Sequence, residues 1–132
     1  MEKIKDLEVV ARNKIYRPYI KKNKFNAKSI VIDGHKFPSI KEAQRYQELK
    51  LLKKAGKIKN LELQPEFEII PKQKYRGKTL RKAKYTPDFK YLDIDNNEWV
   101  IEEVKGMPTV DYVLRKKLFI LKYGDEYKFL ET

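Results

Sequence analysis

The sequence contains no cysteine and only one histidine, His35, and this limits the chemistry available to it. A disulfide framework and a thiolate metal site are excluded, and a single imidazole cannot build a His-rich zinc site. Any bound metal would therefore have oxygen ligands, which favours Mg²⁺ or Mn²⁺.

Long apolar runs are also missing. No segment approaches the roughly 18 consecutive apolar residues of a membrane-spanning helix. The start of the chain, MEKIKDLEVV, lacks the apolar core of a signal peptide. We therefore expect a cytoplasmic protein with no membrane partner.

Positive charge, by contrast, is abundant. The 132 residues include 31 Lys and Arg against 19 Asp and Glu, a net charge of +12. Such a balance favours an anionic polymer as partner. The length suits a single domain with a modest core.

Residues 1–28 differ in pattern from the rest, because they interleave basic positions with aromatic ones and have no regular periodicity. We expect a basic N-terminal arm or a loosely attached helix here. One interpretation is a segment that follows phosphates and stacks on bases, and the other is a solvated terminus. Residues 29–132 are then expected to form the folded domain.

The domain begins with two patterns that predict local structure well. Asp33-Gly34 follows a β-branched run and predicts a short hairpin. Ser39 and Glu42 have the spacing of a capping box, and no breaker follows before Gly56, so a helix is predicted over 39–55.

The second half alternates in the manner of strands. A strand is predicted in LELQPEFEII up to Pro71, a turn at Gly77, and two further strands in AKYTPDFKYLDI and EWVIEEVKG, joined at 95–97. These three strands would form an antiparallel meander. A helix from Thr109 to Gly124 and a strand in EYKFLE follow. The order helix, three strands, helix, strand predicts an α+β sandwich.

The predicted strands carry a constellation that suits phosphodiester hydrolysis. Because strand side chains alternate, Glu103 and Lys105 share one face. The turn at 95–97 would bring Asp88 close to Glu103, so that two carboxylates could hold a metal ion while Lys105 orients water or stabilises charge. The alternative is a solvated strand face with an ion pair, because acid-x-Lys triplets are common.

Two helix positions depart from a simple amphipathic pattern. Glu42 projects toward the core side of its helix, which allows either the capping role or a metal-ligand role. In the second helix Lys117 interrupts a predicted apolar stripe, and its ammonium would reach the rim or the scissile phosphate. The stripe is Val110, Val113, Leu114, Leu118 and Leu121. On this pattern the outer side, suited to backbone phosphates or a subunit contact, carries Arg115, Lys116, Lys122, Tyr112 and Phe119.

The chain resembles a phage and prophage family catalogued as domain of unknown function 1064, itself similar to PD-(D/E)XK nucleases. The resemblance covers roughly residues 29–124 and rests on IDGHKFPSIKEAQRYQELKLLKKAGKI, LELQPEF, YTPDFKY with WVIEEVKG, and TVDYVLRKKLF. It implies a restriction-endonuclease-like core with a central mixed sheet flanked by helices. It also implies Mg²⁺-dependent cleavage, with Asp88, Glu103 and Lys105 as the catalytic core and Glu42 as the helix acid. The metal set expected on this basis is Asp88, Glu103, Val104 and Glu42.

The leading hypothesis is thus an endonuclease that acts on structured or branched DNA in a bacterial host. A homodimer of this endonuclease could cut two strands. A non-catalytic nucleic-acid-binding module of the same fold is the first alternative. A prophage protein that binds an acidic partner is the second. Nucleic-acid contacts are expected from Arg76, Arg81, Lys84, Arg115, Lys116 and Lys117.

Overall fold

The computed structural model describes residues 19–22 and 28–132, with side chains from Ser29 onward. The chain forms two compact units that divide between Lys57 and Ile58. Of the predicted N-terminal arm, only residues 19–22 and 28 are described, so the prediction of an arm lies almost wholly outside the described residues.

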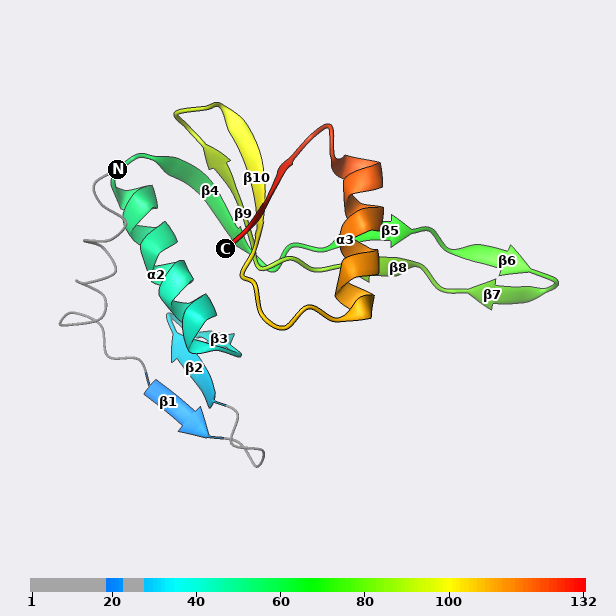
Figure 1. Cartoon of the computed structure of the whole chain (residues 1–132), viewed down its shortest axis with the longest axis horizontal. Coiled ribbons are helices and arrows are strands. Elements are labelled where there is room, and N and C mark those ends of the chain that lie inside the picture. Colours follow the sequence, from blue (N-terminus) through cyan, green and yellow to red (C-terminus); the bar gives the residue numbers. More distant parts are fainter. Residues whose placement is uncertain (1–18, 23–27) are drawn as a thin grey trace. The chain divides into compact units, whose positions relative to one another are not determined.

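The first unit contains a small antiparallel sheet in the order β1-β2-β3 (Figure 1). Its strands are β1 (Tyr19–Lys22), β2 (Lys28–Ile32) and β3 (His35–Phe37). Asp33 and Gly34 join β2 to β3 with positive φ angles of 53° and 79°. Two consecutive positive φ angles are those of a two-residue hairpin turn that matches strand twist. The hairpin predicted at this position is confirmed.

Helix α2 (Ile40–Lys54) packs against β2 and β3. It begins where the sequence predicted, because the Glu42 backbone N–H donates to Ser39 Oγ at 3.1 Å. It ends before Gly56, which has a positive φ of 79°. Its buried apolar face consists of Ala43, Tyr46 and Leu49.

The second unit is built on one long antiparallel hairpin that is interrupted twice. Strand β4 pairs with β9, β5 with β8, and β6 with β7. The bounds are β4 (Ile58–Leu63), β5 (Phe67–Ile70), β6 (Gln73–Tyr75), β7 (Lys78–Leu80), β8 (Ala83–Tyr85) and β9 (Phe89–Asp93). Figure 1 shows the β6 and β7 end of this hairpin extending beyond β5 and β8.

The interruptions correct two strand predictions. The strand expected in LELQPEFEII is divided into β4 and β5, and the one expected in AKYTPDFKYLDI into β8 and β9. Proline cannot donate to a strand ladder, and Pro65 and Pro87 stand at the two sides of the break. Gln64 has a positive φ of 49°, and its N–H donates to the Asp88 carbonyl oxygen at 2.9 Å across the break. Gln64-Pro65 therefore separates two strands.

A four-stranded sheet in the order β11-β10-β9-β4 forms the centre of the second unit. Strand β10 (Glu98–Glu103) runs antiparallel to β9, and the turn at 94–97 joins them as predicted. The last strand, β11 (Lys128–Glu131), pairs parallel with β10, so the sheet is mixed. The antiparallel arrangement of β4, β9 and β10 confirms the predicted meander in its central part.

Helix α3 (Val110–Tyr123) precedes β11 and packs against β5 and β8. The Tyr112 N–H donates to Thr109 Oγ1 at 3.0 Å, so the predicted N-cap is confirmed. The core beneath this helix is largely aromatic and contains Phe67, Ile69, Tyr85, Ile101 and Phe119.

The buried face of α3 is not the one that the sequence pattern indicated. Phe119 was placed on the outer side, yet it is completely buried and contacts Phe67 and Tyr123 edge-on or stacked. Val110 and Leu121, assigned to the core, are 87% and 84% exposed. The helix has two apolar stripes, and the aromatic one is buried because large rings remove more apolar surface from water than aliphatic side chains do. Leu118, from the predicted stripe, does contact the core.

Within residues 28–132 the chain thus has two helices and a mixed sheet, a mixed α/β architecture. No helix in this described part combines the length and the apolar character needed to cross a membrane.

Candidate active site

The site begins at the break between β8 and β9, where Asp88 follows the fully buried Pro87. Asp88 immediately precedes β9, opposite the end of β10. The Val104 backbone N–H donates to Asp88 Oδ2 at 2.7 Å. The carboxylate is therefore fixed at the end of β10.

Glu103 is the last residue of β10 and lies beside Asp88. The register pairs Glu102 with Phe89, so that the next residue of β10 faces the residue before β9. The side chains of Asp88 and Glu103 share a hydrogen bond. Two carboxyl groups from adjacent strands therefore meet at one point of the sheet.

The environment of Glu103 disfavours a negative charge in the absence of a cation. Burial raises the pKa of Glu103 to about 7, and the charge of Asp88 adds to this increase. The Tyr85 hydroxyl donates to Glu103 Oε1 at 2.5 Å and opposes the increase. Two carboxyl groups this close hold one proton between them unless a positive charge takes its place.

Lys105 lies two residues beyond Glu103, where β10 has ended. Its backbone N–H donates to the Thr132 carbonyl oxygen at 2.6 Å, and its side chain is exposed. A hydrogen bond from Tyr112 lowers the pKa of Glu131, and the charge of Lys105 contributes to the decrease. The Lys105 charge therefore acts on Glu131, the residue that pairs with Glu103 in the parallel register.

Two residues beside this pair, Glu131 and Tyr85, were not predicted from the sequence. Glu131 accepts a hydrogen bond from the Tyr112 hydroxyl and forms an ion pair with Lys116 at 3.1 Å. Tyr85 orients Glu103, as described above. The only local signal for Glu131 is its alternation with Phe129. The parallel pairing of β11 with β10 requires a crossover connection through α3, and no short motif encodes that connection.

Glu102 takes no part in the pair, in agreement with the strand alternation. It is completely buried, accepts a hydrogen bond from the Tyr91 hydroxyl at 2.7 Å and another from Thr132 Oγ1 at 2.9 Å. These bonds satisfy a carboxylate that would be costly to bury alone. Glu102 therefore fixes the end of β11 against β10 and β9.

A family model described as "Protein of unknown function (DUF1064)" matches residues 22–130. The chain belongs to this family. No curated protein and no solved structure matches the chain. The DUF1064 match includes the acidic pair, Lys105 and both helices, so the geometry described above lies within the family domain.

Glu42 also lies within the DUF1064 match, but it belongs to the first unit, whereas the acidic pair belongs to the second. Its backbone N–H donates to Ser39 Oγ, as the predicted capping box requires. Glu42 is 7% exposed and lies on the core side of α2, as predicted. Its role as a metal ligand stays a prediction.

The cations predicted on α3 lie on different faces. Lys116 was placed on the outer side, but it is half-buried, pairs with Glu131 and lies 5.3 Å from the centre of the Phe129 ring. Arg115 binds Asp111 at 2.9 Å and donates to the Lys84 carbonyl oxygen. Both cations therefore contact residues that pack around α3, and their placement on the outer side is wrong because the aromatic side of α3 is the packed side. Their contacts with nucleic acid stay a prediction.

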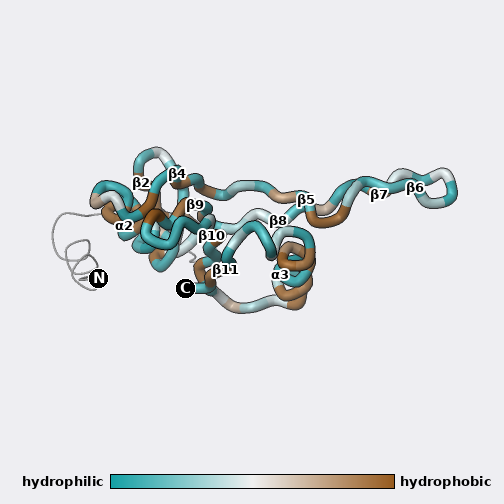
Figure 2. The backbone as a smooth tube through the Cα atoms, turned by 90° about the horizontal axis from the view of Figure 1, so that it is seen from above, coloured by the Kyte–Doolittle hydropathy of each residue, from teal (hydrophilic) through white to brown (hydrophobic). Residues whose placement is uncertain are grey.

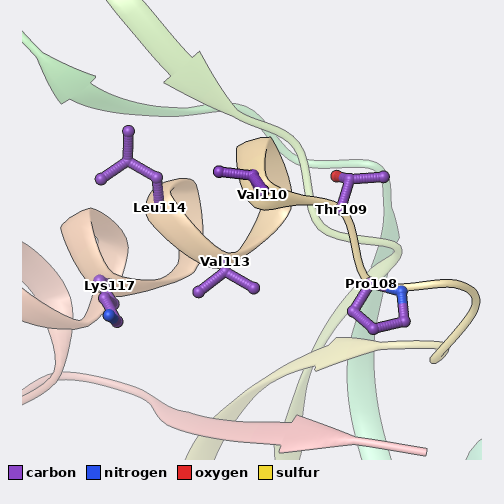
Figure 3. A pocket seen from close by; sticks show the side chains of 6 residues that line it. All are labelled: Pro108, Thr109, Val110, Val113, Leu114 and Lys117. Atoms are coloured by element: carbon purple, nitrogen blue, oxygen red, sulfur yellow. The ribbon is translucent and has the colours of Figure 1, made fainter.

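Lys117 projects from the exposed aliphatic side of α3. It lines an open hollow of about 470 Å³, and Figure 3 shows the side chains around this hollow. The hollow is lined by Pro108, Thr109, Val110, Val113, Leu114 and Lys117. Lys117 is exposed, in agreement with the rim position that was one of its two alternatives, and its contact with the scissile phosphate stays a prediction.

The donor atoms at the acidic pair fit a hard divalent cation. Among residues 29–132, no group of three or more His, Asp or Glu side chains could hold a metal ion. Mg²⁺ does not need such a group, because it is commonly bound by one or two carboxylates, retained waters and substrate phosphates. Asp88 and Glu103 provide two carboxylates, and Val104 has a backbone carbonyl nearby in sequence.

Proposed function

We propose that this protein is a metal-dependent nuclease of the PD-(D/E)XK type that hydrolyses phosphodiester bonds in DNA. The observation that carries the proposal is the meeting of Asp88 and Glu103 at the ends of two adjacent strands, with Lys105 two residues further along. On this proposal the mixed sheet of the second unit belongs to a restriction-endonuclease-like core.

The electrostatics of the pair support catalysis over simple binding. A surface that only binds phosphates has no reason to gather carboxylates where the phosphates must approach. A divalent cation held by Asp88, Glu103 and the backbone of Val104 removes that conflict. When bound, Mg²⁺ offsets charge on the phosphoryl oxygens and lowers the pKa of a coordinated water.

The surrounding residues have separate parts in this proposal. Tyr85 holds the Glu103 carboxylate in one orientation through its 2.5 Å hydrogen bond. The Val104 N–H does the same for Asp88. Lys105 is exposed and lies two residues beyond Glu103, and in this proposal it orients water or stabilises charge as the bond breaks.

The net charge of +12 and the basic residues of the second unit favour a polyanionic substrate. The alternative is a non-catalytic binding module of the same fold. The exposed basic residues are compatible with this alternative too, because both proteins would bind a polyanion. The two differ in metal binding and in cleavage, which can be measured separately.

Metal binding is expected to depend on Asp88. We expect Mn²⁺ to bind the native protein, with affinity reduced at least about tenfold in Asp88→Asn. The asparagine oxygen can still accept the hydrogen bond from Val104, so the fold is retained while one charge is lost. Electron paramagnetic resonance of free Mn²⁺ during titration measures the affinity, and Asp125→Asn, an exposed carboxylate elsewhere, is the matched control. Equal affinity in native protein and Asp88→Asn would contradict the assignment.

Lys105 is expected to act on the reaction and not on the metal. Lys105→Met should slow Mg²⁺-dependent cleavage about a hundredfold, because one preorganised charge at the reacting group is removed. Its Mn²⁺ affinity should stay within about twofold of native, since methionine keeps the length of the side chain and removes no ligand. Single-turnover cleavage and Mn²⁺ titration on the same preparation separate the two effects. A loss of Mn²⁺ binding equal to the loss of rate would assign Lys105 a structural role instead.

A further inference from the structure

The far end of the long hairpin is a separate basic feature, which we call the ribbon and define as residues 71–84. Seven of these 14 residues are Lys or Arg and none is acidic. The basic residues are Lys72, Lys74, Arg76, Lys78, Arg81, Lys82 and Lys84. Every residue from Pro71 to Lys82 is exposed, and Figure 2 shows the ribbon as a largely hydrophilic extension beyond β5 and β8.

The ribbon keeps a regular shape although its residues from Pro71 to Lys82 are exposed. Strands β6 and β7 pair antiparallel, and Arg76 and Gly77 form the turn with positive φ angles of 48° and 81°. A two-stranded hairpin alone is at best marginally stable in water, and like charges make it less so. A polyanion that neutralises these charges would stabilise the ribbon.

The cations of the ribbon are also available to a partner. Within the described part of the chain, Lys84 at its base pairs with Glu66 at 2.9 Å, and no other basic residue of the ribbon forms an ion pair. Tyr75, next to the turn, is 62% exposed, with the Arg76 guanidinium 5.9 Å from its ring centre. The tip therefore presents positive charge and one aromatic ring to solvent.

We propose that the ribbon is a DNA-binding arm that enters the major groove of a B-form duplex. Two strands about 4.8 Å apart, with their side chains, fit a groove about 12 Å wide but not a minor groove of about 6 Å. Five residues from Pro71 to the turn span about 17 Å, which exceeds the groove depth of about 8.5 Å. The cations would contact phosphates on both walls, while Tyr75 and the turn lie against base edges.

The same geometry separates DNA from RNA. The major groove of an A-form RNA duplex is deep and narrow, so a ribbon of this width is excluded from it. The ribbon therefore favours duplex DNA over duplex RNA as the substrate of the proposed nuclease. The inference relies on the proposed function only for the choice of nucleic acid as partner, and it is tested by binding without cleavage.

The test compares two triple variants that lose the same charge. The ribbon variant is Lys74→Ala with Arg76→Ala and Lys78→Ala, and the control is Lys36→Ala with Lys53→Ala and Lys54→Ala in the first unit. All six side chains are exposed, so both variants should unfold in urea at the native midpoint. Fluorescence anisotropy in EDTA measures binding to a labelled DNA duplex and to an RNA duplex of the same sequence.

We expect the ribbon variant to bind duplex DNA at least about tenfold more weakly at roughly 0.1 M salt, with a salt dependence shallower by about 2.7 in log–log slope. The control should change less than about threefold, and RNA binding should be weak and equal in all three proteins.

Methyl green, a major-groove ligand, should compete with the native protein, and the minor-groove ligand netropsin should not. Equal losses in the two variants, an equal fall in RNA binding or competition by netropsin alone would overturn the proposal. Ribbon-dependent binding without any cleavage would leave it standing while removing the nuclease.

Discussion

Replacing Glu103 with glutamine should reduce Mg²⁺-dependent cleavage of DNA by about a thousandfold or more. The reason is that a metal ion contributes several kcal/mol to the stabilisation of charge in the transition state, and about 1.4 kcal/mol corresponds to a factor of ten in rate. Glutamine keeps the size of the side chain and an oxygen that can accept the Tyr85 hydrogen bond of 2.5 Å. Single-turnover cleavage of a labelled duplex, with enzyme in excess, measures the rate.

The matched control is Glu98→Gln, at the other end of the same strand. Glu98 is exposed and lies outside the acidic pair, so its loss should change the rate less than about threefold. If Glu103→Gln cleaved as fast as Glu98→Gln, the acidic pair would not be the metal site. Both variants should retain the native unfolding midpoint, which separates lost chemistry from lost structure.

Replacing Phe119 with alanine should lower the free energy of unfolding by about 3–5 kcal/mol, which is the usual cost of removing a fully buried aromatic side chain. Phe119 is completely buried, and its ring lies 5.1 Å from that of Phe67 and 5.1 Å from that of Tyr123. The loss leaves a cavity in the aromatic core between α3 and the β5–β8 hairpin. Urea unfolding followed by circular dichroism measures the change.

Leu121→Ala on the same helix is the control for this experiment. Both residues lie in the C-terminal half of α3 but differ in burial, since Leu121 is 84% exposed. Its replacement should cost less than about 0.5 kcal/mol. The opposite order, with Leu121→Ala the more costly change, would mean that the aliphatic stripe is the packed face of α3.

The features that the sequence predicted well are those with a local chemical cause. Asp33-Gly34 predicts a hairpin because both positions need positive φ. Ser39 and Thr109 predict helix starts because each can accept from a free N–H of the first turn, and both do so. Such signals need no knowledge of the rest of the fold.

The features that the sequence did not reveal depend on distant partners. Helix α3 carries an aliphatic stripe and an aromatic one, and which of them is buried depends on the facing strands β5 and β8. The breaks at Gln64-Pro65 and at Pro87 divide strands whose alternation continues across them. Proline occurs at both places. Because proline has no N–H to donate to a strand ladder, its presence indicates a break at each position.

Part of the candidate site could also be predicted from local sequence signals. Strand alternation and one turn were enough to predict that Asp88 and Glu103 approach each other. The residues that hold them, Tyr85 and the Val104 N–H, come from a neighbouring strand pair and from the backbone, and no spacing rule pointed to them. Glu131 was missed because parallel pairing of β11 with β10 is a property of the whole fold.

The most direct measurement for the central claim is cleavage by the native protein of a labelled panel of linear duplex, single strand, flap and four-way junction. Each substrate is incubated with Mg²⁺, with Mn²⁺ or with EDTA. We expect cuts with either metal and none with EDTA, and the preferred substrate would then define the task of the nuclease. DNA that is bound but uncut under all three conditions would contradict the proposed nuclease and favour the binding module.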